Sequence, residues 1–186
     1  TDAPTTDDLF VVGTVCTVKQ ILRLPGDNIR VLVEGSYRAG VEQFSKEDDG
    51  CMRARVFRME TEPGRVSERR KEALVRALQD RFEEYAGLAS QITNDVVMTV
   101  LDGGEPGYLA DYVAQNTPLA YETKQELLEE LHDVRRLERV VRVLGHEIEI
   151  LQIENSIQDK LKEQIDKNQK EYYLREQLKI IQTELG

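Results

Sequence analysis

The residues able to act as nucleophiles or general bases are few in this chain, and none stands in a catalytic motif. The histidines are His132 and His146, which lie outside any HExxH pattern and have no cysteine beside them. The serines stand outside any GxSxG turn, and no lysine or histidine is spaced to serve one of them as a base. We therefore predict no catalytic residue and expect a chain that works by binding.

The patterns that hold phosphates or metals are also missing. The glycine cluster at residues 103–107 lacks the lysine and hydroxyl of a phosphate loop, and the carboxylate of Glu105 would repel phosphate. We interpret this cluster as a turn between helices. Cys16 and Cys51 lie in separate apolar runs without a CxxC motif or a nearby histidine, which predicts buried free thiols. No metal and no cofactor is expected in this chain.

The charge of the chain restricts its partners. The 35 acidic residues outnumber the 25 basic ones and give a net charge of −10. Such a charge repels phosphate backbones and anionic membranes, so nucleic acid is not an expected partner. No apolar run approaches the roughly 18 residues that begin to indicate a membrane helix, and the opening residues are not those of a secretory leader. We expect a soluble, cytoplasmic chain with no membrane partner.

The first third of the chain has the pattern of a β meander. Residues 9–24 and 29–39 are rich in Val, Ile, Thr and Leu and are separated by the turn sequence Pro-Gly-Asp-Asn. Gly35 is expected either to end the second strand or to bulge it, and a third strand is predicted near residues 51–60. So few strands bury little surface by themselves. We therefore predict a partial, truncated sheet within residues 1–62.

Residues 63–132 carry helical periodicity and are predicted to form a small helical bundle. Ser67 is the expected N-cap of the first helix, and Gly87 is its expected C-cap. Residues 94–101 suit either a strand or a short helix, and we favour the helix. Thr123, with a glutamate three residues later, predicts the capping box of the last helix of the bundle.

Residues 133–186 contain no proline and predict one very long helix. At about 1.5 Å of rise per residue it would extend roughly 75 Å, which is too far to be buried in a small domain. Gly145 could mark either close packing or a bend in it. The predicted fold class is therefore α+β: a small, truncated antiparallel β meander, a helical bundle, and one projecting C-terminal helix with coiled-coil character.

Two apolar stripes follow this helix and predict two contact surfaces. The first advances by four and three residues alternately, as in a coiled-coil seam, and predicts pairing with another helix. It consists of Leu137, Val141, Leu144, Ile148 and Leu151. After it, the apolar residues advance by fours and rotate around the helix. The second stripe consists of Leu174, Leu178, Ile181 and Leu185.

Apolar side chains also gather at the tip of the predicted hairpin. Ile21, Leu22 and Leu24 flank the turn, where a three-stranded sheet can hardly cover all of them. Two interpretations stay open. Either these residues pack on the rest of the sheet or on the bundle, or they form an exposed apolar patch that contacts unfolded polypeptide.

Three strings of the sequence carry a family resemblance. They are residues 7–39 (DDLFVVGTVCTVKQILRLPGDNIRVLVEGSYRA), 110–114 (ADYVA) and 168–186 (NQKEYYLREQLKIIQTELG), of which the last is the most specific. In this order they resemble the amino-terminal region of the Lon family of ATP-dependent serine proteases. Members of that family begin with additional strands before the segment that matches residue 7 onward, which agrees with the prediction of a truncated sheet.

The resemblance implies a β-rich substrate-binding domain, a helical bundle, and a long helix that leads toward an ATPase module and a protease domain with a serine-lysine dyad. No position of this sequence matches the phosphate loop or the dyad, so no catalytic or nucleotide-binding residue is carried over. ATP and Mg²⁺ belong to the ATPase module of the parent protein. The chain itself is therefore not expected to be an enzyme.

The implied function is to bind unfolded or damaged protein substrates and to aid assembly of a homohexamer for protein quality control. In this interpretation the hairpin tip contacts substrate, the first stripe of the long helix pairs subunits, and the stripe from Leu174 to Leu185 docks near the ATPase entrance. The alternative is a free-standing coiled-coil scaffold or adaptor without protease activity. A small hydrolase has no motif to support it.

Overall fold

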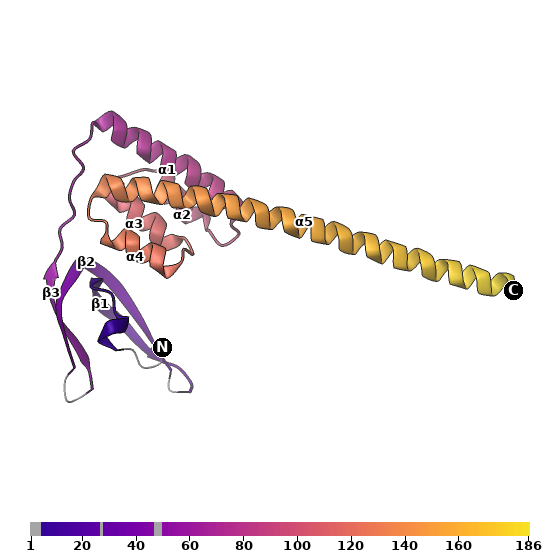
Figure 1. The fold of residues 1–186 in the computed structure, drawn as a ribbon, viewed down its shortest axis with the longest axis horizontal. Coiled ribbons are helices and arrows are strands. Elements are labelled where there is room, and N and C mark those ends of the chain that lie inside the picture. Colours follow the sequence, from indigo (N-terminus) through magenta and orange to yellow (C-terminus); the bar gives the residue numbers. More distant parts are fainter. Residues whose placement is uncertain (1–4, 27, 47–49) are drawn as a thin grey trace.

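The computed structural model describes residues 5–26, 28–46 and 50–186 and has an α+β architecture (Figure 1). An antiparallel sheet is followed by helices that pack together, and the last helix extends far beyond them, so the predicted fold class is confirmed. The elements are η1 (Thr6–Asp8), β1 (Val12–Arg23), β2 (Ile29–Lys46), β3 (Met52–Arg58), α1 (Glu68–Leu88), α2 (Asn94–Leu101), α3 (Pro106–Asn116), α4 (Tyr121–Glu129) and α5 (Asp133–Leu185).

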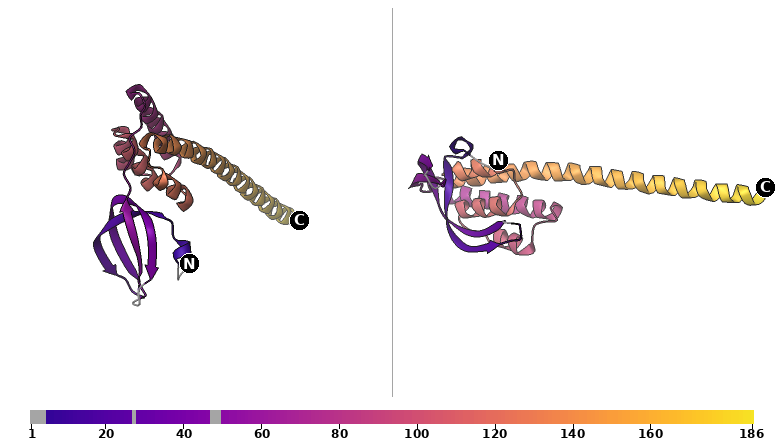
Figure 2. Two further views of the ribbon diagram at one scale, coloured as in Figure 1. Left: turned by 60° about the vertical axis from the view of Figure 1, so that its left-hand side comes forward. Right: turned by 90° about the horizontal axis from the view of Figure 1, so that it is seen from below.

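The strands of the described sheet pair antiparallel in the order β1-β2-β3, as expected of a meander. The register between β1 and β2 skips Ser36, which makes a β-bulge directly after Gly35. Of the two expectations for Gly35, the bulge is therefore confirmed, and β2 continues past it to Lys46. Bulges bend a strand and increase its twist, which agrees with the curled sheet seen in Figure 2.

The cysteines correct one prediction. Cys16 and Cys51 were expected to be buried, but both are exposed. The reason is that the described sheet forms a single layer, and buried strand residues occur in it only at Ala39 and Gly40. A thiol elsewhere on this sheet has no second layer to cover it.

The hydrophobic core lies among the helices. α1 and α3 pack against the first part of α5, and α2 and α4 close the bundle around them. Side chains from three of these helices are fully buried at its centre: Leu78, Phe82, Leu109, Val113, Leu137, Val140 and Leu144. The first part of α5, as far as Ile148, is therefore a wall of the bundle.

The helix ends test the capping predictions. Ser67 caps α1, because its Oγ accepts a hydrogen bond from the backbone N–H of Arg70 at 3.3 Å. Residues 94–101 form the favoured helix α2. Two predictions are wrong: α1 runs through Gly87 and ends at Leu88, and α4 begins at Tyr121, so that Thr123 lies inside the helix. The residue at which a helix begins or ends therefore depends on the packing of the adjoining chain, and a capping motif in the sequence does not fix it alone.

The long helix behaves as predicted. α5 runs from Asp133 to Leu185, and none of its described residues beyond Ile148 is buried, because there it leaves the bundle (Figures 1 and 2). The helix passes unbroken through Gly145. Apart from the adjoining helix backbone, no atom of the described chain lies within 4 Å of where a Cβ would be, so close packing does not explain this glycine. Within the described chain, no helix combines the length and hydropathy that crossing a membrane requires.

A short backbone clamp ties the segment after the sheet to the start of α5. Glu62 forms an isolated parallel bridge with His132, and the N–H of Asp133 donates to the Glu62 carbonyl at 3.1 Å. The N–H of Gly64 then donates to Asp133 Oδ1 at 2.6 Å. The chain approaches so closely here that a Cβ on Gly64 would lie 2.4 Å from Cγ2 of Val134. Glycine is the residue that allows this approach.

Replacing Gly64 tests the clamp. Gly64→Ala should lower the free energy of unfolding by about 1–3 kcal/mol, because the added methyl overlaps Val134 and forces the backbone apart. The matched control is Gly145→Ala, where the space is open; it should leave stability unchanged or raise it by up to about 1 kcal/mol. Urea unfolding measures both. If Gly64→Ala and Gly145→Ala changed the free energy of unfolding equally, the close approach of Gly64 to Val134 would not contribute to stability.

A second prediction concerns alkaline pH. Tyr85 is buried in the core beside Phe82, with ring centroids 6.3 Å apart. Burial first, and the charge of Glu147 second, raise the pKa of Tyr85. The unfolded chain therefore releases the Tyr85 proton at lower pH than the folded chain. The contribution of neutral Tyr85 to the free energy of unfolding is present below about pH 10 and is lost as the pH rises further.

Tyr85→Phe keeps the ring and removes the ionisable group. We expect the unfolding free energy of this variant to fall less steeply above about pH 10 than that of the unchanged chain. Urea unfolding at a series of pH values measures the slope. A slope identical to that of the unchanged chain would mean that Tyr85 does not titrate differently on folding.

Candidate functional site

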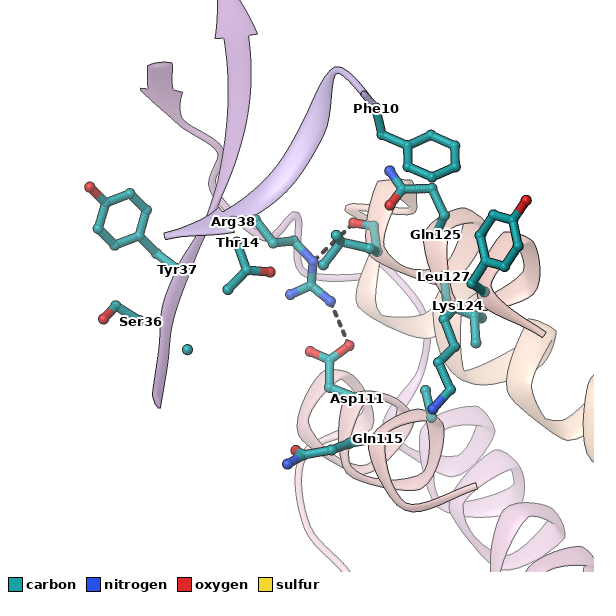
Figure 3. A pocket seen from close by; sticks show the side chains of 14 residues that line it. Phe10, Thr14, Ser36, Tyr37, Arg38, Asp111, Gln115, Lys124, Gln125 and Leu127 are labelled. Carbon is teal, nitrogen blue, oxygen red and sulfur yellow. Dashed lines mark hydrogen bonds and ion pairs between the residues drawn. The ribbon is translucent and has the colours of Figure 1, made fainter. Parts of the chain in front are cut away.

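A cleft of about 540 Å³ lies between the sheet and the helices (Figure 3). Its walls come from β1 and β2 on one side and from α3 and α4 on the other. At its edge Phe10 contacts Tyr121, with ring centroids 6.4 Å apart. The lining consists of Phe10, Thr14, Gly35, Ser36, Tyr37, Arg38, Asp111, Ala114, Gln115, Tyr121, Lys124, Gln125, Leu127 and Leu128.

Arg38 of β2 reaches across the cleft from the sheet to the helices (Figure 3). Its Nη2 donates a hydrogen bond to Asp111 Oδ1 on α3, and its Nε donates to the carbonyl of Leu128 at 3.0 Å. Arg136 of α5 meets the same carboxylate, with its Nε 3.0 Å from Asp111 Oδ1. A single carboxylate therefore holds the guanidinium groups of a strand and of the long helix, and we call these three residues the arginine clamp.

The arginine clamp contains a buried charge. The Arg136 side chain is only 1% exposed. Burial lowers the pKa of Arg136 and the positive charge of Arg38 lowers it further, whereas the carboxylates, Asp111 foremost, raise it. Arg136 Nη1 also donates to the carbonyl of Glu130. Its Nε–H has no aligned hydrogen-bond acceptor, so Asp111 holds that atom by charge attraction. The buried cation therefore depends on Asp111.

The cleft also contains a cation for which the described residues supply no ion-pair partner. Lys124 of α4 is partly buried, and within the described part of the chain its ammonium forms no ion pair. Gln125 beside it is occupied, because its Nε2 donates to the Val12 carbonyl at 3.0 Å and to Glu129. Among the residues of the lining, Arg38 and Lys124 therefore face a single carboxylate, that of Asp111. The cleft is positive in a chain whose net charge is −10.

The predicted hairpin residues are exposed but do not share one face. Ile21, Leu22 and Leu24 are 61%, 44% and 39% exposed. Ile21 pairs with Val31, whereas Leu22 pairs with Arg30, and successive residues of a strand point to opposite faces. Within the described chain these three side chains are therefore exposed, and they do not pack on the rest of the sheet or on the bundle.

A larger apolar set accompanies Ile21 on its face. The cross-strand pairs Val18 with Val33 and Ile21 with Val31 point to the same side, together with Ile29 at the end of β2. We call these five residues the hairpin stripe; each is between 46% and 62% exposed. Thr14 pairs with Arg38 on the same face, so the hairpin stripe continues along the strands into the cleft. In Figure 3, Arg38 points toward the helices and Tyr37 away from them.

The stripes of α5 differ in their surroundings. In the first stripe Leu137, Leu144 and Ile148 are buried in the bundle of their own chain, and Val141 and Leu151 are partly buried against it. These residues therefore already have a partner within the chain, and pairing two subunits through them would require α5 to leave the bundle. The second stripe is exposed throughout, with Leu174 at 49%, Leu178 at 58%, Ile181 at 53% and Leu185 at 81%.

Sequence reasoning missed the cleft and the arginine clamp. Arg38 and Asp111 are 73 residues apart in the chain, and no local pattern joins them. A signal existed for Arg136, because it is followed at four-residue steps by the apolar Val140 and Leu144 and so lies on the buried face of the helix. Within the described residues, no cluster of three His, Cys, Asp or Glu side chains could hold a metal ion.

Comparison with protein families finds one match that spans most of the chain. Residues 1–146 match the family described as the ATP-dependent protease La (LON) substrate-binding domain. The Lon proteases of Brevibacillus choshinensis and Azospirillum brasilense are 40% and 43% identical to it over 185 residues, which is 100% of this chain. The chain spans only 23% and 22% of the length of these two relatives.

Two solved structures share the fold. The N-terminal domain of Mycobacterium avium complex Lon protease superposes with a TM-score of 0.59 at 22% identity, covering 79% of this chain and 75% of that one. The Lon N-terminal domain protein from Xanthomonas campestris gives a TM-score of 0.51 at 17% identity, covering 75% of this chain and 71% of that one. At these identities the likeness concerns the fold alone.

The arginine clamp can be tested by removing its one negative charge. Asp111→Asn should lower the free energy of unfolding by about 2–4 kcal/mol, because the buried Arg136 loses its counter-charge while the side-chain volume stays the same. The control is Glu126→Gln, which removes an exposed ion pair with Arg139 whose atoms lie 3.7 Å apart; it should cost less than about 1 kcal/mol. Urea unfolding that ranks the two variants equally would contradict a central role for Asp111.

Proposed function

The chain belongs to the Lon substrate-binding domain family, and on this premise we propose that it is a non-catalytic module that captures unfolded or damaged polypeptide for a Lon-type ATP-dependent serine protease. The observation that supports this most directly is the hairpin stripe, five exposed apolar side chains on one face of a sheet. Contiguous exposed apolar surface marks a binding site, and unfolded chains are the ligands that offer apolar side chains in an extended form.

The parent protein supplies the chemistry. Its ATPase module would hold ATP and Mg²⁺, and its protease domain would cut the polypeptide in the cytoplasm as part of protein quality control. The exposed stripe Leu174, Leu178, Ile181 and Leu185 would dock α5 beside the ATPase module, because a row of half-exposed apolar side chains on a projecting helix is stabilised by burial against a neighbour. The role of this chain is then to present substrate at a fixed distance from that module.

Assembly of the parent hexamer would use the outer part of α5. The stripe from Leu137 to Leu151 is engaged in the bundle, so subunit contacts are better supported by the exposed residues that follow it. These are Ile153, Ile157, Leu161 and Ile165, each between 53% and 61% exposed. Since they advance by fours and rotate around the helix, a partner would have to cross α5 at an angle.

Binding of an unfolded protein tests the proposed function. Fluorescein-labelled α-lactalbumin, reduced and carbamidomethylated so that it stays unfolded, should bind the chain in a fluorescence anisotropy titration, whereas the disulfide-intact protein should not. The double variant Ile21→Ser with Val31→Ser should weaken binding by about 5–30-fold, because two apolar side chains of the hairpin stripe lose roughly 1–2 kcal/mol of burial.

The matched control lies on the opposite face. Leu22→Ser with Leu32→Ser removes two side chains of comparable size and exposure from the other side of the same hairpin and should change binding less than twofold. If both double variants lost binding of unfolded α-lactalbumin equally, the proposal that the hairpin stripe is the binding face would be rejected. Absence of binding by the unchanged chain would reject polypeptide capture altogether.

A further inference from the structure

We propose that the cleft and the hairpin stripe form one binding track for an extended, acidic polypeptide segment, in which a side-chain carboxylate of the segment pairs with Lys124 while its apolar side chains lie on the stripe. This inference rests on the proposed function, since it names the class of segment that the same site prefers. The carboxylate would come from an aspartate or glutamate within the segment.

The register of the sheet makes the track continuous. The cross-strand pairs Thr14 with Arg38, Cys16 with Gly35, Val18 with Val33 and Ile21 with Val31 follow one another on the same face. The first two of these pairs contribute lining residues of the cleft, and the last two belong to the hairpin stripe. A segment that leaves the cleft along the strands therefore meets apolar side chains, which an extended chain contacts with alternate residues.

The charge of the cleft selects an acidic occupant. Lys124 is partly buried and lacks an ion-pair partner within the described chain, and a partly buried ammonium is stabilised by an opposite charge. Asp111 does not supply that charge, because its described ion pairs join its Oδ1 to Arg38 and Arg136 and none joins it to Lys124. A carboxylate brought by the ligand would complete the pairing and would also face Arg38, whose side chain is 14% exposed.

The backbone and the size of the cleft favour a peptide. Ser36 is skipped by the register at the β-bulge, and Ser36 and Gly35 line the cleft, so the sheet there has an unpaired residue for a peptide to contact. A volume of about 540 Å³ lies within the range of about 300–1,000 Å³ found for specific ligand sites and admits a few residues of an extended chain.

Charge reversal at Lys124 tests the track. The probes are three fluorescein-labelled 12-residue peptides in which leucine alternates with aspartate, asparagine or lysine, titrated by anisotropy at low salt. The unchanged chain should bind the aspartate peptide about 5–10-fold more tightly than the asparagine peptide, as expected for one charge-assisted hydrogen bond that is partly exposed. Lys124→Glu should abolish that preference, and Lys124→Ala should reduce it.

The matched control is Lys162→Glu on the exposed part of α5, which makes the same change in net charge far from the cleft and should keep the preference within twofold. Thermal unfolding followed by circular dichroism shows that each variant is folded. Lys124 is not part of the core, and the alanine variant retains the apolar face of α4.

The outcomes separate the two proposals. If unfolded α-lactalbumin binds but the aspartate and asparagine peptides bind equally, the acidic track is rejected and polypeptide capture stands. Equal loss of preference in Lys162→Glu would likewise reject Lys124 as the contact. If N-acetylaspartate competes at the same concentration as the aspartate peptide, the cleft is a small-carboxylate site and the track is rejected. If no polypeptide probe binds, the proposed function itself fails.

Discussion

The carboxylate of Asp111 is the contact on which the arrangement of this chain depends. Within the residues that the structure describes, the sheet and the helical bundle share no apolar core of any size, because the buried strand residues there are Ala39 and Gly40. Polar contacts therefore orient one part on the other, and Asp111 draws Arg38 of the sheet and Arg136 of the long helix to one point. A partly exposed carboxylate that neutralises a fully buried guanidinium fixes direction as well as distance, which loose apolar contact would not do.

This polar junction explains why a cleft exists at that place. If apolar side chains joined the sheet to the bundle, they would interdigitate and fill the space between them. Arg38 instead spans the gap with a long side chain that donates a hydrogen bond to Asp111, and the Gln125 amide donates to the Val12 carbonyl at the rim. The cost is a sheet that leaves its apolar residues uncovered over most of its length. Under the proposed function, that uncovered surface is the part that would contact the bound polypeptide.

Most features set by neighbouring residues could be predicted from the sequence, apart from the helix ends expected at Gly87 and Thr123, whereas features set by distant residues could not. The long helix and the cap at Ser67 follow from local periodicity and backbone preference. The bulge beside Gly35 and the helix at 94–101 were each one of two alternatives that the sequence left open. The arginine clamp joins residues separated by 73 positions, and no spacing encodes that contact. The cysteines were mistaken for the same reason, since apolar neighbours indicate a buried strand only when a second layer covers it.

The seam on α5 shows most clearly what periodicity leaves undecided. Steps of four and three residues state that one face of a helix will be buried, but they carry no information about whether the partner belongs to the same chain. Here Leu137, Leu144 and Ile148 pack on α1 and α3, and the helix then continues for more than thirty residues with apolar side chains exposed. Because the inner turns are fixed in the core, they set the direction of the outer turns, in which no described residue beyond Ile148 is buried. A rigid projecting helix of that kind can fix the position of the sheet and the bundle relative to any partner that its far end contacts. How precisely it does so depends on how firmly the inner turns of α5 are packed in the core.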